Sequence, residues 1–177
     1  VVNVPGSHLV DDAQFGLGEA RFCSKDYTEA IFEYHRLINE YPNSSLAPTA
    51  QYKVAKSYAN QSNNVHLDQS NTQRAISEFR RFIEDYPDLE LTADAEEMLS
   101  ELNSKLAAKV VEIADNYMKW GYHRAAQVYY QRVLEFYNDT PWAGNAKLGL
   151  AMVKARKGEV EQALIELRQL LSNGVQP

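Results

Sequence analysis

Apolar residues recur along most of the chain at intervals of three and four positions, which is the spacing of amphipathic helices. Short polar stretches separate these segments, and most of the 8 Gly and 6 Pro residues fall in them. The pattern therefore predicts an all-α chain whose helices are joined by short turns.

Three of the predicted helices have closely similar sequences. Each carries a small residue, an aromatic residue four positions later, two adjacent apolar residues and then an aromatic Tyr. These segments are YTEAIFEYHRLINEYP (27–42), TQRAISEFRRFIEDYP (72–87) and HRAAQVYYQRVLEFYN (123–138). Such repetition is typical of stacked helix pairs, each of which must bury its apolar face against a neighbour.

Alanines define the register of the repeat. One alanine stands at the same place in each of the three segments, and another follows it 20 residues later, just inside the next helix. The two sets are Ala30, Ala75 and Ala126, and Ala50, Ala95 and Ala146. Within a pair the spacing is 17 residues, from Ala13 to Ala30 and from Ala146 to Ala163, so the basic unit has 37 residues.

Two insertions interrupt the 37-residue unit. Eight additional residues fall in the polar stretch SNNVHLDQSN (62–71), which predicts an elongated loop within the second pair. Fourteen additional residues fall between Ala95 and Ala126, where the run 91–120 contains no Gly or Pro and keeps apolar residues at helical spacing. They predict one long helix over about 91–120.

Composition narrows the possible functions. The 18 Lys and Arg against 24 Asp and Glu residues give a net charge of -6 without a block of like charge, so we expect no nucleic-acid partner. No run approaches the roughly 18 to 20 apolar residues that a membrane-spanning helix needs. Cys23 is the only cysteine, which excludes an intrachain disulfide and leaves the cellular compartment open.

No residue pattern indicates catalysis. The four histidines lie in different repeats, and none has a second ligand at a metal-binding spacing. A Gly-rich phosphate loop, a G-x-S-x-G motif and an H-E-x-x-H motif are all absent from the sequence. We therefore expect no catalytic residue, no metal and no cofactor, and a chain that is not an enzyme.

The repeat resembles the tetratricopeptide family. The matching residues are Leu17-Gly18, Ala30, Tyr34 and Pro42 in the first pair, and Val54-Ala55, Tyr58, Ala75, Phe79 and Pro87 in the second. The signature Trp of the first helix is missing, and the unit is three residues longer than the usual 34. The resemblance implies an α-solenoid of about four helix pairs, over about 10–42, 46–87, 91–138 and 141–173, in a single domain covering 1–177.

Three segments, in chain order, carry a narrower resemblance: LDQSNTQRAISEFRRFIEDYP (67–87), SKLAAKVVEIADNY (104–117) and YNDTPWAGNA (137–146). With the long helix between them, they resemble the BamD family of outer-membrane assembly lipoproteins of Gram-negative bacteria. The resemblance implies a scaffold on the periplasmic face of the outer membrane, attached only through a lipidated cysteine upstream of Val1. Its implied partners are the barrel subunit of the β-barrel assembly complex and segments of unfolded outer-membrane proteins.

The beginning of the chain fits a fragment of a longer protein. It starts at Val1 without Met or a signal peptide, and residues 1–12 read as the end of a connection. On the family resemblance, the chain would start at the second repeat, and an N-terminal repeat and a lipid anchor would precede it.

A peptide-binding groove is expected on the first helix of each pair, because these helices line the concave side of a tetratricopeptide stack. The expected groove residues are Phe15, Glu19, Phe22, Tyr52, Lys56 and Asn60. Aromatic anchors with interspersed polar groups suit an extended peptide. Phe15 and Tyr52 fit equally well as side chains that pack between helices.

A second surface is expected toward the C-terminus, where cations gather near an aromatic residue. The expected partner-subunit edge consists of Arg124, Arg132, Trp142 and Arg156. Cations near the end of a helix also favour its dipole, which explains Arg156 without a partner. Two other functions fit the same repeats: an envelope tetratricopeptide protein that coordinates cell division or peptidoglycan synthesis, and a regulatory repeat module of a longer protein.

Overall fold

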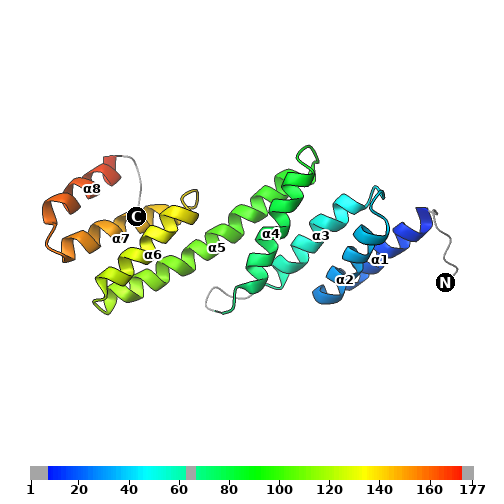
Figure 1. Ribbon diagram of the computed structural model, residues 1–177, viewed down its shortest axis with the longest axis horizontal. Coiled ribbons are helices and arrows are strands. Elements are labelled where there is room, and N and C mark those ends of the chain that lie inside the picture. Colours follow the sequence, from blue (N-terminus) through cyan, green and yellow to red (C-terminus); the bar gives the residue numbers. More distant parts are fainter. Residues whose placement is uncertain (1–7, 63–66, 173–177) are drawn as a thin grey trace. The chain divides into compact units, whose positions relative to one another are not determined.

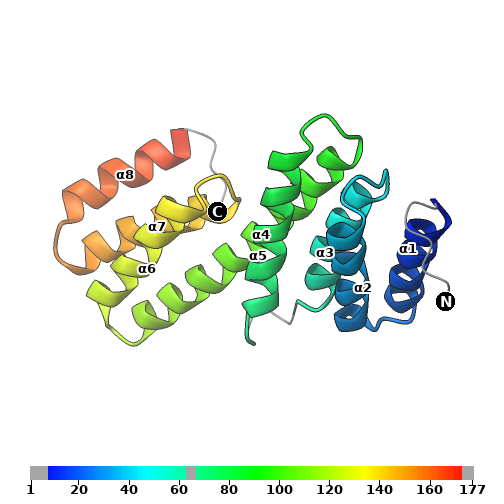
Figure 2. The same ribbon diagram turned by 45° about the vertical axis from the view of Figure 1, so that its right-hand side comes forward.

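The computed structural model describes residues 8–62 and 67–172, and within these ranges it contains eight helices and no strand. Successive helices reverse direction to form pairs (Figures 1 and 2). In chain order the helices are α1 (His8–Cys23), α2 (Tyr27–Glu40), α3 (Ala47–Asn60), α4 (Ser70–Asp85), α5 (Leu91–Lys119), α6 (His123–Phe136), α7 (Trp142–Arg156) and α8 (Val160–Ser172). The prediction of an all-α chain of repeated helix pairs is confirmed.

The predicted long helix is also confirmed. α5 has 29 residues and ends at Lys119, one residue before the predicted end at Trp120. The chain turns there at Gly121, whose φ of +80° is a left-handed conformation that glycine adopts without strain. The predicted elongated loop lies between the end of α3 and the beginning of α4, and its residues 63–66 are outside the described residues.

The alanine register places small side chains where helices touch. Six register alanines have no exposed surface, and they are Ala30, Ala50, Ala75, Ala95, Ala126 and Ala146. Ala13 differs, because it is exposed on a side of α1 that no described helix covers. The register therefore predicts close helix contacts correctly wherever a neighbouring helix is present.

Two glycines allow aromatic rings to approach the backbone of a neighbouring helix. A Cβ atom added to Gly18 would lie 2.4 Å from the Tyr34 ring, and one added to Gly149 would lie 2.3 Å from the Tyr130 ring. Both distances are far shorter than van der Waals contact, so these rings depend on the absence of a side chain. Tyr34 and Tyr130 occupy the same repeat position, so the same packing recurs in the two halves of the chain.

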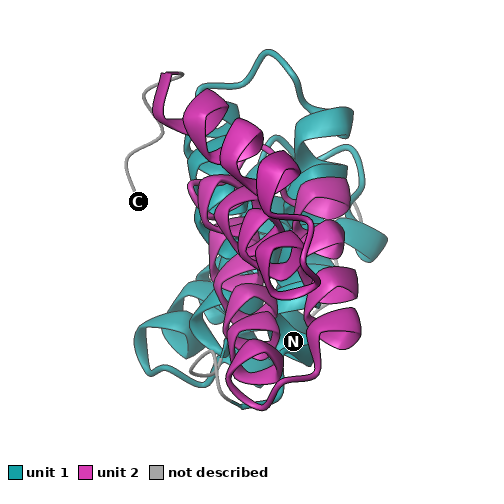
Figure 3. Cartoon of the chain, turned by 90° about the vertical axis from the view of Figure 1, so that its left-hand side faces the viewer, with its two compact units in different colours: residues 1–102 teal, residues 103–177 magenta. Residues whose placement is uncertain are grey.

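The chain divides into two compact units, residues 1–102 and residues 103–177, and α5 contributes residues to both (Figure 3). In unit 1, a buried cluster joins α2 to α3 and includes Tyr34 and Val54. In unit 2, a buried cluster joins α5, α6 and α7 and includes Val111, Tyr130 and Val153. The expectation of a single repeat domain stays a prediction.

Candidate protein-binding surfaces

Two of the three predicted groove residues on α1, Phe15 and Phe22, are half-buried aromatic side chains. The Phe15 ring packs against Tyr34 with 5.8 Å between centroids, and the Phe22 ring packs against Tyr27 with 5.4 Å. The Lys53 ammonium lies 4.8 Å from the centroid of the Phe22 ring. Phe15 and Phe22 each keep part of their surface exposed, so α1 offers aromatic surface to an apolar side chain of a partner.

Tyr52 on α3 is placed differently from these rings. It is only 3% exposed, and its ring centroid lies 5.9 Å from that of Phe79 and 5.7 Å from that of Phe82. Tyr52 therefore packs between helices. Its hydroxyl donates a hydrogen bond to Asp94 in the first turn of α5, and Lys56 donates one to the hydroxyl oxygen at 3.1 Å.

Glu19 connects the helices α1, α2 and α3. Its carboxylate accepts hydrogen bonds from the Tyr34 hydroxyl at 2.5 Å and from the Lys53 ammonium at 2.8 Å. Along the same set of first helices, the Lys56 ammonium lies 3.9 Å from the Asp94 carboxylate. Because each of these two cations has an acidic neighbour, the surface presents aromatic faces and paired charges rather than a strong field of one sign.

Sequence reasoning missed Lys53 and Asp94 in this network. Lys53 lies three positions before Lys56 and so shares its side of α3, a spacing that could have indicated it. Asp94 lies 42 residues from Tyr52, and only the stacking of successive pairs brings the two together. Asn60, which was predicted for the groove, is exposed at the end of α3.

Three buried tyrosines each donate a hydrogen bond to a carboxylate. The pairs are Tyr34 with Glu19, Tyr52 with Asp94, and Tyr130 with Asp115. Burial, and then the hydrogen bond to the carboxylate, raises the pKa of each tyrosine far above the ordinary value near 10. These hydroxyls remain neutral donors at physiological pH, so their role is to hold helices in register.

In unit 2, the exposed side of α6 is rich in large apolar side chains. Tyr122 immediately precedes the helix and is 62% exposed, while Val128 and Phe136 on the helix are 62% and 60% exposed. Arg132 lies between Val128 and Phe136, at spacings of four residues that place all three on one side. Aromatic and aliphatic side chains around an Arg are typical of the centres of protein-binding surfaces.

Comparison of the repeats shows that this surface is specific to α6. Arg36, Arg81 and Arg132 occupy one repeat position, six residues after the register alanine. Four residues later, α2 and α4 carry an acid, and the resulting ion pairs are Arg36 with Glu40 at 3.0 Å and Arg81 with Asp85 at 3.6 Å. In α6 the corresponding residue is Phe136, and no carboxylate within the described ranges forms an ion pair with Arg132.

The sequence therefore carried a signal that was not used, namely an apolar residue in place of the acid that neutralises the same Arg in other repeats. We name Val128, Arg132 and Phe136 the α6 patch. Arg132 belonged to the predicted edge, whereas Val128 and Phe136 were missed.

The other residues of the predicted edge lie in different surroundings. Arg124 is exposed in the first turn of α6, where it lines an apolar surface pocket of about 610 Å³ together with Tyr117 and Tyr122. Trp142 is half-buried against the core of unit 2. Arg156 is exposed in the last turn of α7, where a cation complements the helix dipole. The structure thus brings Arg124 and Arg132 together on one helix and gives Trp142 a packing role.

Two kinds of feature are absent from residues 8–62 and 67–172, namely a metal site and a membrane-spanning helix. No group of three or more His, Cys, Asp or Glu residues could hold a metal ion in these ranges. None of the helices there combines the length and the apolar character that crossing a bilayer requires.

The fold and the repeated contacts define a helical repeat protein of the tetratricopeptide-like class. More specifically, the chain belongs to the YfiO family, described as outer membrane lipoprotein, whose sequence profile matches residues 3–169. The resemblance drawn from the order of the three sequence segments is confirmed.

Two curated relatives share this assignment. The outer membrane protein assembly factor BamD of Caulobacter vibrioides is 31% identical over 146 residues, which are 82% of this chain and 48% of the relative. The putative outer membrane protein assembly factor BamD of Aquifex aeolicus is 29% identical in an alignment of 176 positions that covers 95% of this chain and 58% of the relative. The chain thus spans about half the length of the curated relatives it matches.

Among solved structures, that of the MamA protein is 15% identical to this chain, with a TM-score of 0.35. The match covers 92% of this chain and 90% of the MamA chain. A score at this level adds nothing to the family assignment.

Proposed function

We propose that this chain is a non-catalytic scaffold of the machinery that assembles β-barrel proteins in the outer membrane, acting on the periplasmic face of that membrane. Membership in the outer membrane lipoprotein family supports the location, and the names of the two relatives support the assembly role. The attachment would be a lipid anchor upstream of Val1.

The observation that carries the partner assignment is the α6 patch. Arg132 has no ion-pair partner within the described residues and is flanked by two exposed apolar side chains. This combination is typical of protein-binding surfaces, and it is absent from the equivalent positions of α2 and α4. We assign this patch to the barrel subunit, which would supply a carboxylate for Arg132 and apolar contacts for Phe136. Arg124 would extend the same surface toward the α5–α6 turn.

A second surface in unit 1 is assigned to unfolded outer-membrane protein segments. The half-buried rings of Phe15 and Phe22 would receive apolar side chains, and Glu19, Lys56 and the exposed Asn60 would offer polar contacts beside them. Tyr52 would contribute indirectly, by holding Lys56 and Asp94 in place.

The partner assignment can be tested with the full-length lipoprotein and the purified periplasmic domains of the barrel subunit. Reversing charge in Arg124→Glu/Arg132→Glu should weaken binding by at least about tenfold, since each reversal replaces an attraction by a repulsion. Phe136→Glu should have a similar effect. The matched control is Phe32→Glu/Arg36→Glu, because these residues hold on α2 the positions that Val128 and Arg132 of the α6 patch hold on α6, and it should leave the affinity within about twofold.

Two results would contradict different parts of the proposal. Unchanged affinity in Arg124→Glu/Arg132→Glu and in Phe136→Glu would remove the α6 patch as the contact. Failure of the unsubstituted lipoprotein to bind any barrel-assembly subunit would remove the scaffold function itself.

A further inference from the structure

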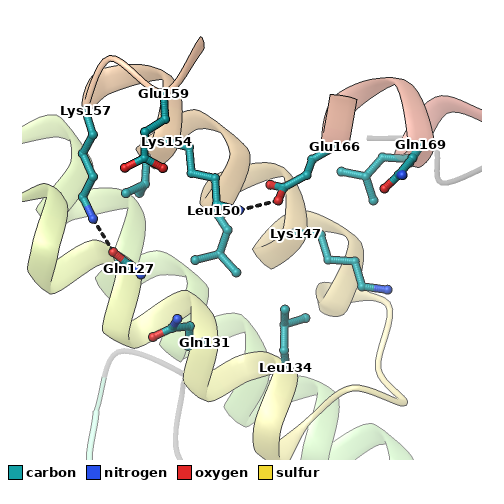
Figure 4. A pocket seen from close by; sticks show the side chains of 12 residues that line it. Gln127, Gln131, Leu134, Lys147, Leu150, Lys154, Lys157, Glu159, Glu166 and Gln169 are labelled. Carbon is teal, nitrogen blue, oxygen red and sulfur yellow. Dashed lines mark hydrogen bonds and ion pairs between the residues drawn. The ribbon is translucent and has the colours of Figure 1, made fainter. Parts of the chain in front are cut away.

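A groove of about 500 Å³ lies between α6, α7 and α8 in unit 2 (Figure 4). Its apolar lining includes Leu134 of α6, Leu150 of α7 and Leu170 of α8. Figure 4 shows Leu134 and Leu150 directed into the space between the helices. Its volume is in the range of about 300 to 1,000 Å³ that is usual for sites that bind small ligands or a few residues of a chain.

The repeat register shows why unit 2 has this groove. Three of its lining residues, Gln127, Lys154 and Leu170, stand at the positions that Ile31, Tyr58 and Phe82 occupy in unit 1. In unit 1 these side chains fill the space: Ile31 is 8% exposed, Phe82 is fully buried, and Tyr58 packs against the buried cluster. The groove therefore results from the replacement of large apolar side chains by polar and smaller ones.

Several polar groups around the groove have no partner among the described residues. The side-chain amides of Gln131 and Gln169 make no hydrogen bond with the residues that the structure describes, and Lys147 forms no ion pair with them. Within the described part of the chain, the Lys157 ammonium donates its hydrogen bond to the neutral side-chain amide of Gln127, at 2.5 Å (Figure 4). Lys154 forms an ion pair with Glu166 across the groove, and with Glu159 as the only other acid of the lining, the three lysines leave the groove with a net positive charge.

We propose that this groove binds an extended polypeptide segment that carries an acidic side chain between apolar ones. Side-chain amides can both donate and accept hydrogen bonds, as the free N–H and C=O groups of an extended backbone require. A helical ligand has satisfied its own backbone groups and would leave Gln131 and Gln169 unused. Lys147, and secondarily Lys157, select the acidic side chain by charge complementarity.

This site differs from both surfaces in the proposed function. It lies on unit 2, away from the unit 1 groove in sequence, and its lining includes none of Val128, Arg132 and Phe136. Peptide binding here does not depend on the barrel subunit, so the two proposals can fail separately.

The test uses fluorescence anisotropy with the full chain and a labelled peptide of about eight residues, in which Val and Thr alternate around a central Asp so that the backbone stays extended. A second peptide has Asn in place of Asp. We expect saturable binding of the Asp peptide, and Lys147→Ala should weaken it by roughly three- to tenfold through loss of a charge-assisted contact. The same substitution should leave binding of the Asn peptide unchanged. Arg168→Ala is the matched control, because Arg168 is an exposed cation on α8 that does not line the groove.

A second variant closes the groove with the residues that unit 1 uses. Gln127→Ile/Lys154→Tyr/Leu170→Phe should abolish binding of both peptides while the melting temperature stays the same or rises, because the filled packing already exists in the first repeats. Binding that survives in this variant would overturn the proposal, and so would the absence of saturable binding to the unsubstituted chain. Sedimentation measurements complete the test, since a dimer that the filled variant abolishes would assign the groove to a second copy of the chain instead.

Discussion

At the scale of single residues, the recurring feature is a buried tyrosine hydroxyl that donates to a carboxylate on a neighbouring helix. Tyr34 and Tyr130 stand at one repeat position and reach back 15 residues to Glu19 and Asp115. The second repeat carries Phe79 there, and Tyr52 on α3 supplies the hydrogen bond instead. The same kind of tyrosine–carboxylate contact is thus made from two different repeat positions. Aligning the repeats by sequence alone does not reveal this equivalence.

These tyrosines predict a loss of stability at alkaline pH. Their pKa values are raised in the folded chain, mainly by burial, whereas in the unfolded chain they are near 10. The folded state therefore holds these protons more tightly, and stability that is fully present below about pH 10 falls as the pH rises above it, by up to about 1.4 kcal/mol per pH unit for each tyrosine.

Denaturant unfolding of Tyr130→Phe provides the measurement. Near about pH 9 the variant should be less stable than the unsubstituted chain by roughly 1 kcal/mol, because a hydrogen bond is lost. Near about pH 11 this difference should shrink or reverse, because the variant has one fewer buried hydroxyl to ionise. Val133→Ala changes no titratable group, so it should lower the free energy of unfolding by the same amount at both pH values. If the stability loss of Tyr130→Phe depended on pH in the same way as that of Val133→Ala, the argument would be refuted.

At the scale of helices, the alanine register is the main determinant of how neighbours approach. Ala75 and Ala126 have no exposed surface, so a larger side chain at either place must displace a neighbouring helix. We expect Ala75→Leu and Ala126→Leu each to lower the free energy of unfolding by about 1 to 3 kcal/mol. Ala13→Leu is the control because Ala13 is exposed, and it should change stability by less than about 0.5 kcal/mol. Unchanged thermal midpoints for both buried variants would mean that the register is misplaced.

Helix positions could be predicted from the sequence because periodicity and turn residues are local signals. The end of α5, for example, follows from Gly121 directly after a long run of helical spacing. Whether a given aromatic side chain is buried or exposed could not be predicted from such local signals. Phe15 and Tyr52 have the same character in the sequence, yet Tyr52 is covered by Phe79 and Phe82 while Phe15 keeps exposed surface.

The candidate surfaces were predictable only in part, for a related reason. Arg132 was recognised as a cation, but its significance depends on Phe136 standing where Glu40 and Asp85 stand in other helices. The groove beside Lys147 exists because large apolar side chains are replaced at three positions on three different helices, Gln127, Lys154 and Leu170. No single segment of the sequence shows all three replacements.

At the scale of the whole chain, α5 is the one element shared by the two compact units, which each have their own buried cluster. In repeat proteins, stability is a sum of local terms and terms between neighbours, so a shared helix is expected to couple the unfolding of the parts it joins. The two tryptophans, Trp120 and Trp142, both lie in unit 2. Their fluorescence therefore reports on unit 2, while circular dichroism reports on all helices.

A proline in the middle of α5 should separate these two signals. Ser104 lies inside α5 close to the division between the units, and a proline there removes a backbone hydrogen bond at a cost of about 3 kcal/mol or more. We expect the unsubstituted chain to give coincident denaturant transitions by fluorescence and by circular dichroism, and Ser104→Pro to give transitions at different denaturant concentrations. Ser104→Ala removes the same hydroxyl without breaking the helix, so its two transitions should remain coincident. If the Ser104→Pro transitions also coincided, the units would be coupled by something other than the continuity of α5.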